Sequence, residues 1–168
     1  MISAETVTQT WQRMSQVSAS EAPHWVQTME SEQPVILRYL LYLDDSPFNA
    51  HECELIFYIG TVVWQMMRQS DRHLRKVTRR KLKQAEEANY DFLETLASDT
   101  DADFVSATRV MLKNCPEPEV LRYILEAIME EEEYEPDDPP IRDEYRGLAF
   151  VHLKIALDAF VNSLASRP

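Results

Sequence analysis

Apolar residues recur along this chain at intervals of three and four positions, the spacing of one face of an α-helix. Ser3 is placed to cap a first helix that extends to about Val17. The apolar stripe of this helix consists of Val7, Trp11, Met14 and Val17. Pro23 and Pro34 mark the starts of two further helices, because proline fits the first turn of a helix. The run 35–43 is apolar almost all round, which predicts a buried helix.

The widest apolar surface belongs to the segment near 47–68, which Ser46 and Pro47 are placed to begin. Its apolar residues between 55 and 67 fill an arc of roughly 220°, too wide for a helix on the surface. Because such an arc needs neighbours on two or three sides, this helix is predicted to be the centre of the fold. Glu52 points into the apolar arc. The remaining stripe consists of His51, Glu54, Tyr58, Thr61 and Gln65.

Later segments repeat the helical pattern, but proline and glycine do not mark their boundaries, because neither occurs from Thr61 to Cys115. Ser70 and Asp71 could cap a new helix, or the central helix could continue through them. Further apolar stripes predict helices near 82–96, 101–115, 118–128 and 141–166. We therefore expect an all-α fold: an irregular multi-helix bundle of about seven or eight helices around the central hydrophobic helix. Residues 1–168 are expected to form a single domain.

Composition excludes several classes of enzyme. The chain of 168 residues has 45% hydrophobic residues and only two glycines, so it lacks a glycine-rich phosphate loop and a dinucleotide fingerprint. Neither a nucleophile elbow nor an HExxH zinc motif is present. These absences favour a non-catalytic protein without a cofactor. No secretory signal and no segment long enough to span a membrane is found, and the two cysteines show no metal-binding spacing, so a cytoplasmic location is expected.

Charge is strongly segregated in a chain whose net charge is −12. The segment 68–83 contains eight basic residues and one aspartate, a net charge of +7, which leaves −19 for the rest. If this segment is helical, one face carries Arg68, Arg72, Arg75, Lys76, Arg79 and Lys83. Residues 126–144 form an acidic block of ten carboxylates that includes Glu130, Glu131, Glu132 and Glu133.

These two surfaces predict a protein-interaction module that binds a protein partner or a second copy of the chain, as in a homodimer. The acidic block could also pair with the basic segment of the same chain. Nucleic acid is the less favoured partner, because the −19 carried elsewhere would repel a polyanion.

The alternative hypothesis is a helical bundle that binds a small molecule or a metal ion. Its polar pocket would combine the stripe of the central helix (His51, Glu54, Tyr58, Thr61 and Gln65) with His152 of the last helix. A lone histidine on an apolar face is more commonly a hydrogen-bonded core residue. The chain has a single Glu-x-x-His spacing, at Glu21 and His24, where carboxylate-bridged metal centres use two, so no metal site is predicted. A pocket of a few hundred Å³ would favour this alternative over the interaction module.

Overall fold

In the computed structural model of the chain, residues 1–43, 46–98, 101–129 and 141–166 are described, with the side chains of 92–93, 95–98 and 101–105 excepted. These ranges are helical apart from turns, loops and one isolated β-bridge. The helices are α1 (Ala4–Ser15), α2 (Ala22–Glu32), α3 (Pro34–Leu41), α4 (Ala50–Met67), α5 (Arg79–Ser98), α6 (Asp101–Asn114), α7 (Pro118–Met129) and α8 (Asp143–Val161). The predicted all-α multi-helix bundle is confirmed.

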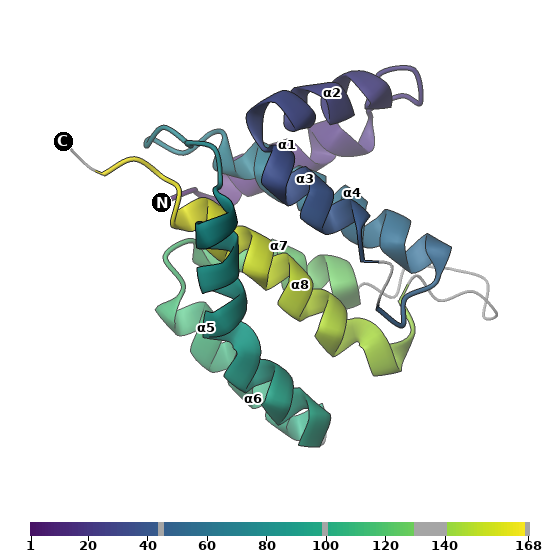
Figure 1. Cartoon of the computed structure of the whole chain (residues 1–168), viewed down its shortest axis with the longest axis vertical. Helices are drawn as coiled ribbons and strands as arrows, with labels where there is room; N and C mark the ends of the chain where they lie inside the picture. The colour runs from purple at the N-terminus through teal and green to yellow at the C-terminus, as the bar shows by residue number, and fades with distance from the viewer. Residues whose placement is uncertain (44–45, 99–100, 130–140, 167–168) are drawn as a thin grey trace.

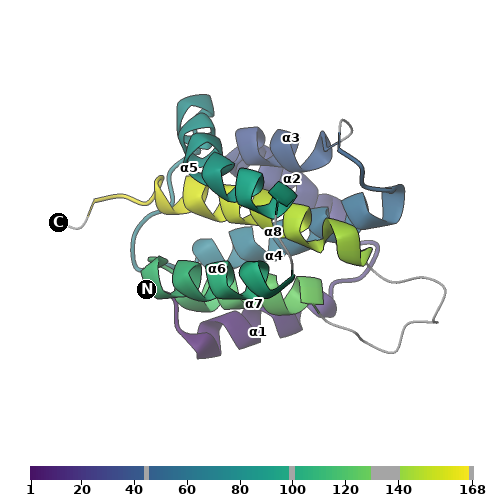
Figure 2. The same ribbon diagram turned by 90° about the horizontal axis from the view of Figure 1, so that it is seen from below.

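The bundle is built around two helices, α4 and α8, which pack side by side (Figures 1 and 2). Helices α1 and α7 cover one side of this pair, while α3 packs on α4 and α5 packs on α8 from the other side. Helix α2 contacts α3, and α6 contacts α7. The last two turns of α4 are buried all round from Ile59 to Met67, which explains why this helix needs neighbours on several sides. Helix α8 shares the central position, with Phe150, Leu153, Leu157 and Phe160 buried as their spacing predicts.

The start of the central helix differs from the prediction. Helix α4 begins after Asn49, whose side chain accepts a hydrogen bond from the Glu52 N–H while the Glu52 carboxylate accepts one from the Asn49 N–H. This reciprocal capping box satisfies two N–H groups at once, which the pair Ser46 and Pro47 could not do. Ser46 instead donates its hydroxyl to the Leu43 carbonyl in the preceding turn. Ser3, in contrast, caps α1 as expected.

Three large apolar side chains predicted to be buried are exposed. Trp11 is 41% exposed because α1 packs through Val7, Thr10 and Met14, a stripe centred one position away from it. Leu41 and Tyr42 are 50% and 70% exposed, because α3 packs through Ile36, Leu37 and Leu40 and these two residues lie off that buried face. Apolar composition alone therefore overstated the burial of the run 35–43.

Close contact between α3 and α4 depends on Gly60. A Cβ atom at this position would lie 2.5 Å from Cδ1 of the buried Leu40 side chain. Glycine lets the two helices approach at this crossing, which fixes where α3 lies on the bundle. Within the described ranges, none of the helices combines the length and hydrophobicity that a bilayer span requires.

Candidate functional site

The basic segment is not one helix. Helix α4 ends at Met67 and α5 begins at Arg79, so the stripe expected from Arg68 to Lys83 on a single helical face is wrong. Between the two helices, Leu74 forms an antiparallel bridge with Leu164. Around this bridge the Arg75 N–H donates to the Ser163 carbonyl at 3.1 Å, and the Ala165 N–H donates to the His73 carbonyl at 2.9 Å. These bonds join segments about ninety residues apart, which helical periodicity does not detect.

A second contact holds the other side of the same extended segment. Gln33 lies buried at the junction of α2 and α3. Its side-chain oxygen accepts a hydrogen bond from the Val77 N–H at 2.9 Å, and its Nε2 donates to the Arg75 carbonyl at 3.2 Å. Val77 is itself buried. The backbone that carries the cations is therefore fixed by hydrogen bonds on both sides before α5 begins.

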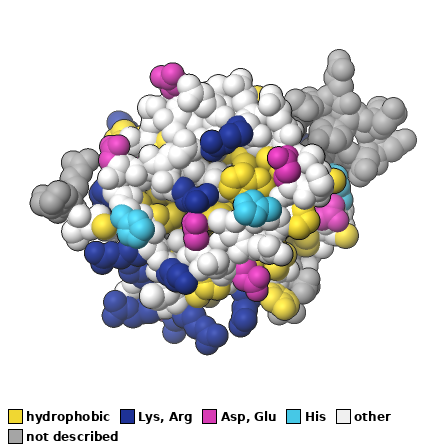
Figure 3. All heavy atoms as spheres, turned by 90° about the horizontal axis from the view of Figure 1, so that it is seen from above, with side chains coloured by type: hydrophobic (Ala, Val, Ile, Leu, Met, Phe, Trp, Pro, Cys, Tyr) yellow, Lys and Arg dark blue, Asp and Glu magenta, His cyan; other side chains and the backbone are white. Residues whose placement is uncertain are grey.

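Six cations of this segment form what we call the basic surface: Arg72, Arg75, Lys76, Arg79, Arg80 and Lys81. Their neighbours in the segment have partners, since Arg68 pairs with Glu32 at 3.1 Å and Lys83 with Glu87 at 3.8 Å. No described carboxylate lies within ion-pair distance of the six. Seen from above, Lys and Arg side chains gather along one edge of the molecule (Figure 3). A concentrated positive potential results.

The start of α5 adds to this potential. Thr78 caps the helix, because its side-chain oxygen accepts a hydrogen bond from the Lys81 N–H at 3.3 Å. Arg79, Arg80 and Lys81 then occupy the first turn, where the helix dipole is already positive and where anions are favoured. Cations in this turn are repelled by the positive end of the helix dipole and by one another, which destabilises the folded chain when nothing is bound there. An acidic partner would lower this repulsion.

A groove of about 530 Å³ lies between α3 and the start of α5. We call it the α3–α5 groove, and it is lined by Pro34, Val35, Arg38, Tyr39, Tyr42, Arg79 and Leu82. Its surface is mainly apolar and aromatic, with two guanidinium groups contributed by different helices. Arg79 belongs to both the groove and the basic surface. The two features therefore form one continuous face of the protein.

One wall of the groove is held in place by His152. The Tyr39 hydroxyl and Nδ1 of His152 share a hydrogen bond of 2.7 Å, and the Phe48 ring meets the His152 ring edge-on with 6.0 Å between centroids. Burial lowers the pKa of His152 to about 4, so its ring is neutral at neutral pH. Burial, with a contribution from Glu86, raises the pKa of Tyr39 well above its usual range. His152 is therefore a hydrogen-bonded residue of the protein interior, and Tyr39 is its hydrogen-bond partner.

The structure distributes the other residues of the expected pocket between surface and core. His51 and Glu54 are exposed and Tyr58 is 39% exposed, whereas Thr61 and Gln65 are buried. Thr61 donates to the Phe57 carbonyl within α4, and the Gln65 side-chain oxygen accepts from Arg68. His152 contacts α3 through Tyr39, a residue outside the expected set. The α3–α5 groove has the expected volume of a few hundred Å³, but none of the six residues of the expected pocket lines it.

The acidic block is described only in part. Glu130, Glu131, Glu132 and Glu133 lie outside the described residues. Of its described carboxylates, Asp143 pairs with Arg146 at 3.1 Å. Neither Asp143 nor the other described members, Glu126 and Glu144, lies within ion-pair distance of the basic surface.

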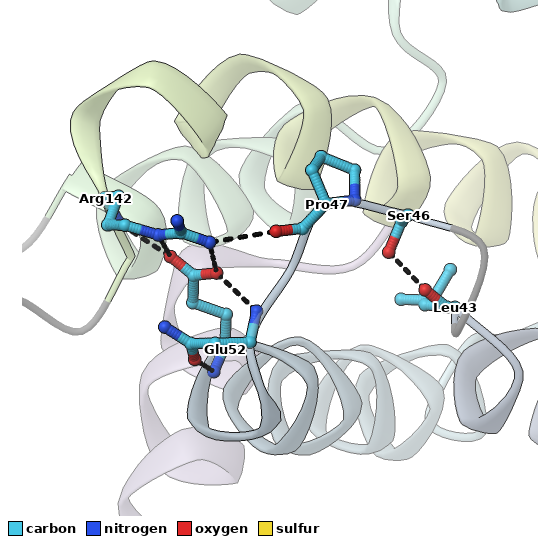
Figure 4. Close-up of polar contacts among 6 residues, drawn as sticks. Leu43, Ser46, Pro47, Glu52 and Arg142 are labelled. Carbon is cyan, nitrogen blue, oxygen red and sulfur yellow. Dashed lines mark hydrogen bonds and ion pairs between the residues drawn. The ribbon is translucent and has the colours of Figure 1, made fainter.

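Glu52, which the sequence placed in the apolar arc, is buried in an ion pair with Arg142 (Figure 4). Its carboxylate accepts hydrogen bonds from the backbone N–H, Nε and Nη2 of Arg142 at 2.8–2.9 Å, and from the Asn49 N–H at 2.8 Å. The Arg142 side chain holds the pKa of Glu52 down, at about 2. Arg142 also donates to the Pro47 carbonyl at 2.9 Å and lies over the Tyr145 ring. With its oxygens occupied in this way, Glu52 joins the starts of α4 and α8 and has a structural role.

In the part of the chain that the structure describes, no three His, Cys, Asp or Glu side chains are grouped as a metal ion would require. No protein-family model, curated protein or solved structure matches this chain.

Proposed function

We propose that this chain is a cytoplasmic, non-catalytic protein-interaction module that binds an acidic segment of a partner protein on the basic surface. The observation that carries the proposal is the clustering of six cations near a hydrogen-bonded backbone, with no described carboxylate within ion-pair distance of them. Like charges held together repel one another, and carboxylates from a partner would relieve that repulsion.

The ordered backbone beneath the cations supports recognition by a partner over simple hydration. Gln33 and the bridge between Leu74 and Leu164 fix the segment from two sides. Because the backbone is ordered before binding, the partner does not have to supply the free energy of ordering it.

A protein partner fits this face better than a nucleic acid. Residues outside 68–83 carry a net charge of −19, which would repel the long phosphate backbone of a duplex. A short acidic segment contacts the local surface alone and avoids most of that repulsion. The groove beside the basic surface also contributes tyrosine and arginine, which are enriched in protein interfaces.

Fluorescence anisotropy with a labelled poly-glutamate peptide tests the proposal. We expect binding at about 20 mM salt that weakens steeply at about 500 mM, where the Debye length is only a few Å. The variant Arg72→Gln/Arg75→Gln/Lys76→Gln should bind at least about ten-fold more weakly at about 20 mM salt, because it removes three charges whose Coulomb attraction to the peptide is little screened there.

A charge-matched control separates this surface from a general effect of net charge. Arg13→Gln/Arg109→Gln/Lys113→Gln removes three exposed cations from α1 and α6 and should bind within about two-fold of the parent chain. Failure of the parent chain to bind the peptide at low salt would refute the proposal. Tighter binding of duplex DNA than of the peptide at about 150 mM salt would reassign the surface to nucleic acid.

A further inference from the structure

The α3–α5 groove has the dimensions and the surface of a receptor for a side chain. Its volume of about 530 Å³ falls within the range of roughly 300–1,000 Å³ found for binding sites, and it exceeds the space that one aromatic ring needs. Val35 and Leu82 contribute aliphatic surface from α3 and α5 respectively. An aromatic ring between them would exclude water from both.

Two arginines at this groove come from opposite sides. Arg38 belongs to α3 and Arg79 is the first residue of α5; both are exposed, and no described carboxylate pairs with either. A guanidinium group binds a carboxylate through two parallel hydrogen bonds, a geometry that lysine does not offer. The groove therefore offers carboxylate recognition on both sides of its apolar surface.

Tyrosines complete the face. Tyr42 lines the groove and is 70% exposed. Tyr39 itself is held by His152, so this wall is formed before any partner binds. Tyrosine and arginine clustered around an apolar depression are the composition of an interface hot spot.

We propose that the α3–α5 groove receives an aromatic side chain from the acidic partner segment, with carboxylates beside that ring bound by Arg38 and Arg79. This inference rests on the proposed function and specifies the chemistry of its partner: an aromatic residue flanked by glutamate or aspartate. Charge complementarity with these two arginines, which pair with no described carboxylate, selects such a segment over an uncharged apolar one.

Two peptides of equal charge test the inference: a glutamate-rich peptide with one central tryptophan, and the same peptide with alanine at that position. By anisotropy at low salt, the tryptophan peptide should bind at least about five-fold more tightly to the parent chain. The variant Arg38→Gln/Tyr42→Ala changes two exposed residues, so the fold is kept, and it should lose that preference.

Trp11→Ala/Arg13→Gln is the matched control, since it removes another exposed aromatic and arginine pair, on α1. It should keep the preference for tryptophan. Ring-current shifts of the Leu82 methyl resonances, seen with the tryptophan peptide and absent with the alanine peptide, would place the ring in the groove.

The outcomes separate the two proposals. Equal binding of both peptides by the parent chain would overturn the groove inference and leave the proposed function standing. Preference for tryptophan that survives in Arg38→Gln/Tyr42→Ala would also overturn it, because the ring would then bind elsewhere. Absence of binding to either peptide at low salt would overturn both proposals.

Discussion

Replacing Glu52 with glutamine removes one negative charge from a buried site and changes little in side-chain volume. In the parent chain the carboxylate accepts four hydrogen bonds, three of them from Arg142 and one from the Asn49 N–H. Glutamine has one acceptor oxygen and an amide group that can only donate. Its NH₂ group would therefore face donors of Arg142 or Asn49 without an acceptor between them.

The magnitude follows from the pKa of Glu52, which the Arg142 hydrogen bonds lower from 4.5 to about 2. A shift of this size corresponds to about 3 kcal/mol of stability at neutral pH, since each pKa unit is about 1.4 kcal/mol. The Arg142 side chain is 39% exposed, and water screens part of the attraction. We therefore expect Glu52→Gln to lower the free energy of unfolding by about 1–3 kcal/mol at pH 7.

Acid should reduce the difference between the two proteins. Because the folded-state pKa is lowered, the contribution of Glu52 is fully present above the unfolded-state value near 4.5 and is lost as pH falls towards 2. At about pH 3, more than half of it is already lost. Urea unfolding at pH 7 and at about pH 3 measures this difference directly.

Glu54→Gln is the control, since Glu54 is an exposed carboxylate on the same helix. It should change stability by less than about 0.5 kcal/mol at either pH. A destabilisation by Glu52→Gln that is equally large at pH 7 and pH 3 would refute the electrostatic explanation. It would leave packing as the cause.

Two other predictions test the core and the support of the basic surface. Ile59 is 1% exposed at the centre of α4, so Ile59→Ala should cost about 2–5 kcal/mol in urea unfolding; a loss below about 1 kcal/mol would show that α4 is peripheral. Gln33→Ala should leave the Val77 N–H and the Arg75 carbonyl without their side-chain partner, so the Val77 amide should exchange its hydrogen at least about ten-fold faster. Unchanged exchange would mean that the bridge to Leu164 alone holds the segment.

Sequence pattern predicted the helices well where their causes are local. Ser3 caps α1, and Pro23 and Pro34 lie in the first turns of α2 and α3, because capping and proline effects act within one turn. Periodicity also placed Glu52 on the buried side of α4. The start of this helix was misplaced because two capping signals compete within four residues, and only the reciprocal bonds of Asn49 and Glu52 decide between them.

The candidate site was anticipated in its charge but not in its shape. The cations of 68–83 are evident in the sequence, yet Gln33 and the bridge to Leu164 hold the non-helical backbone that carries Arg75 and Lys76. Arg38 and Tyr42 lie in a run whose apolar character suggested burial, and no local pattern shows that α5 begins beside them. A buried carboxylate without a visible partner at Glu52 was a signal that Arg142 or another cation would be found opposite.

By itself, the sequence determined the helical class, the positions of most helices, the buried faces of α4 and α8 and the segregation of charge, because these follow from residue type and from spacing within a few turns. Only the tertiary structure decided that residues 68–78 lie between two helices, that Arg38 and Arg79 share one groove, and that Tyr39 is bonded to His152. Those contacts join residues between about forty and more than one hundred positions apart. The packing of α3 and α5 on the central pair of helices creates them.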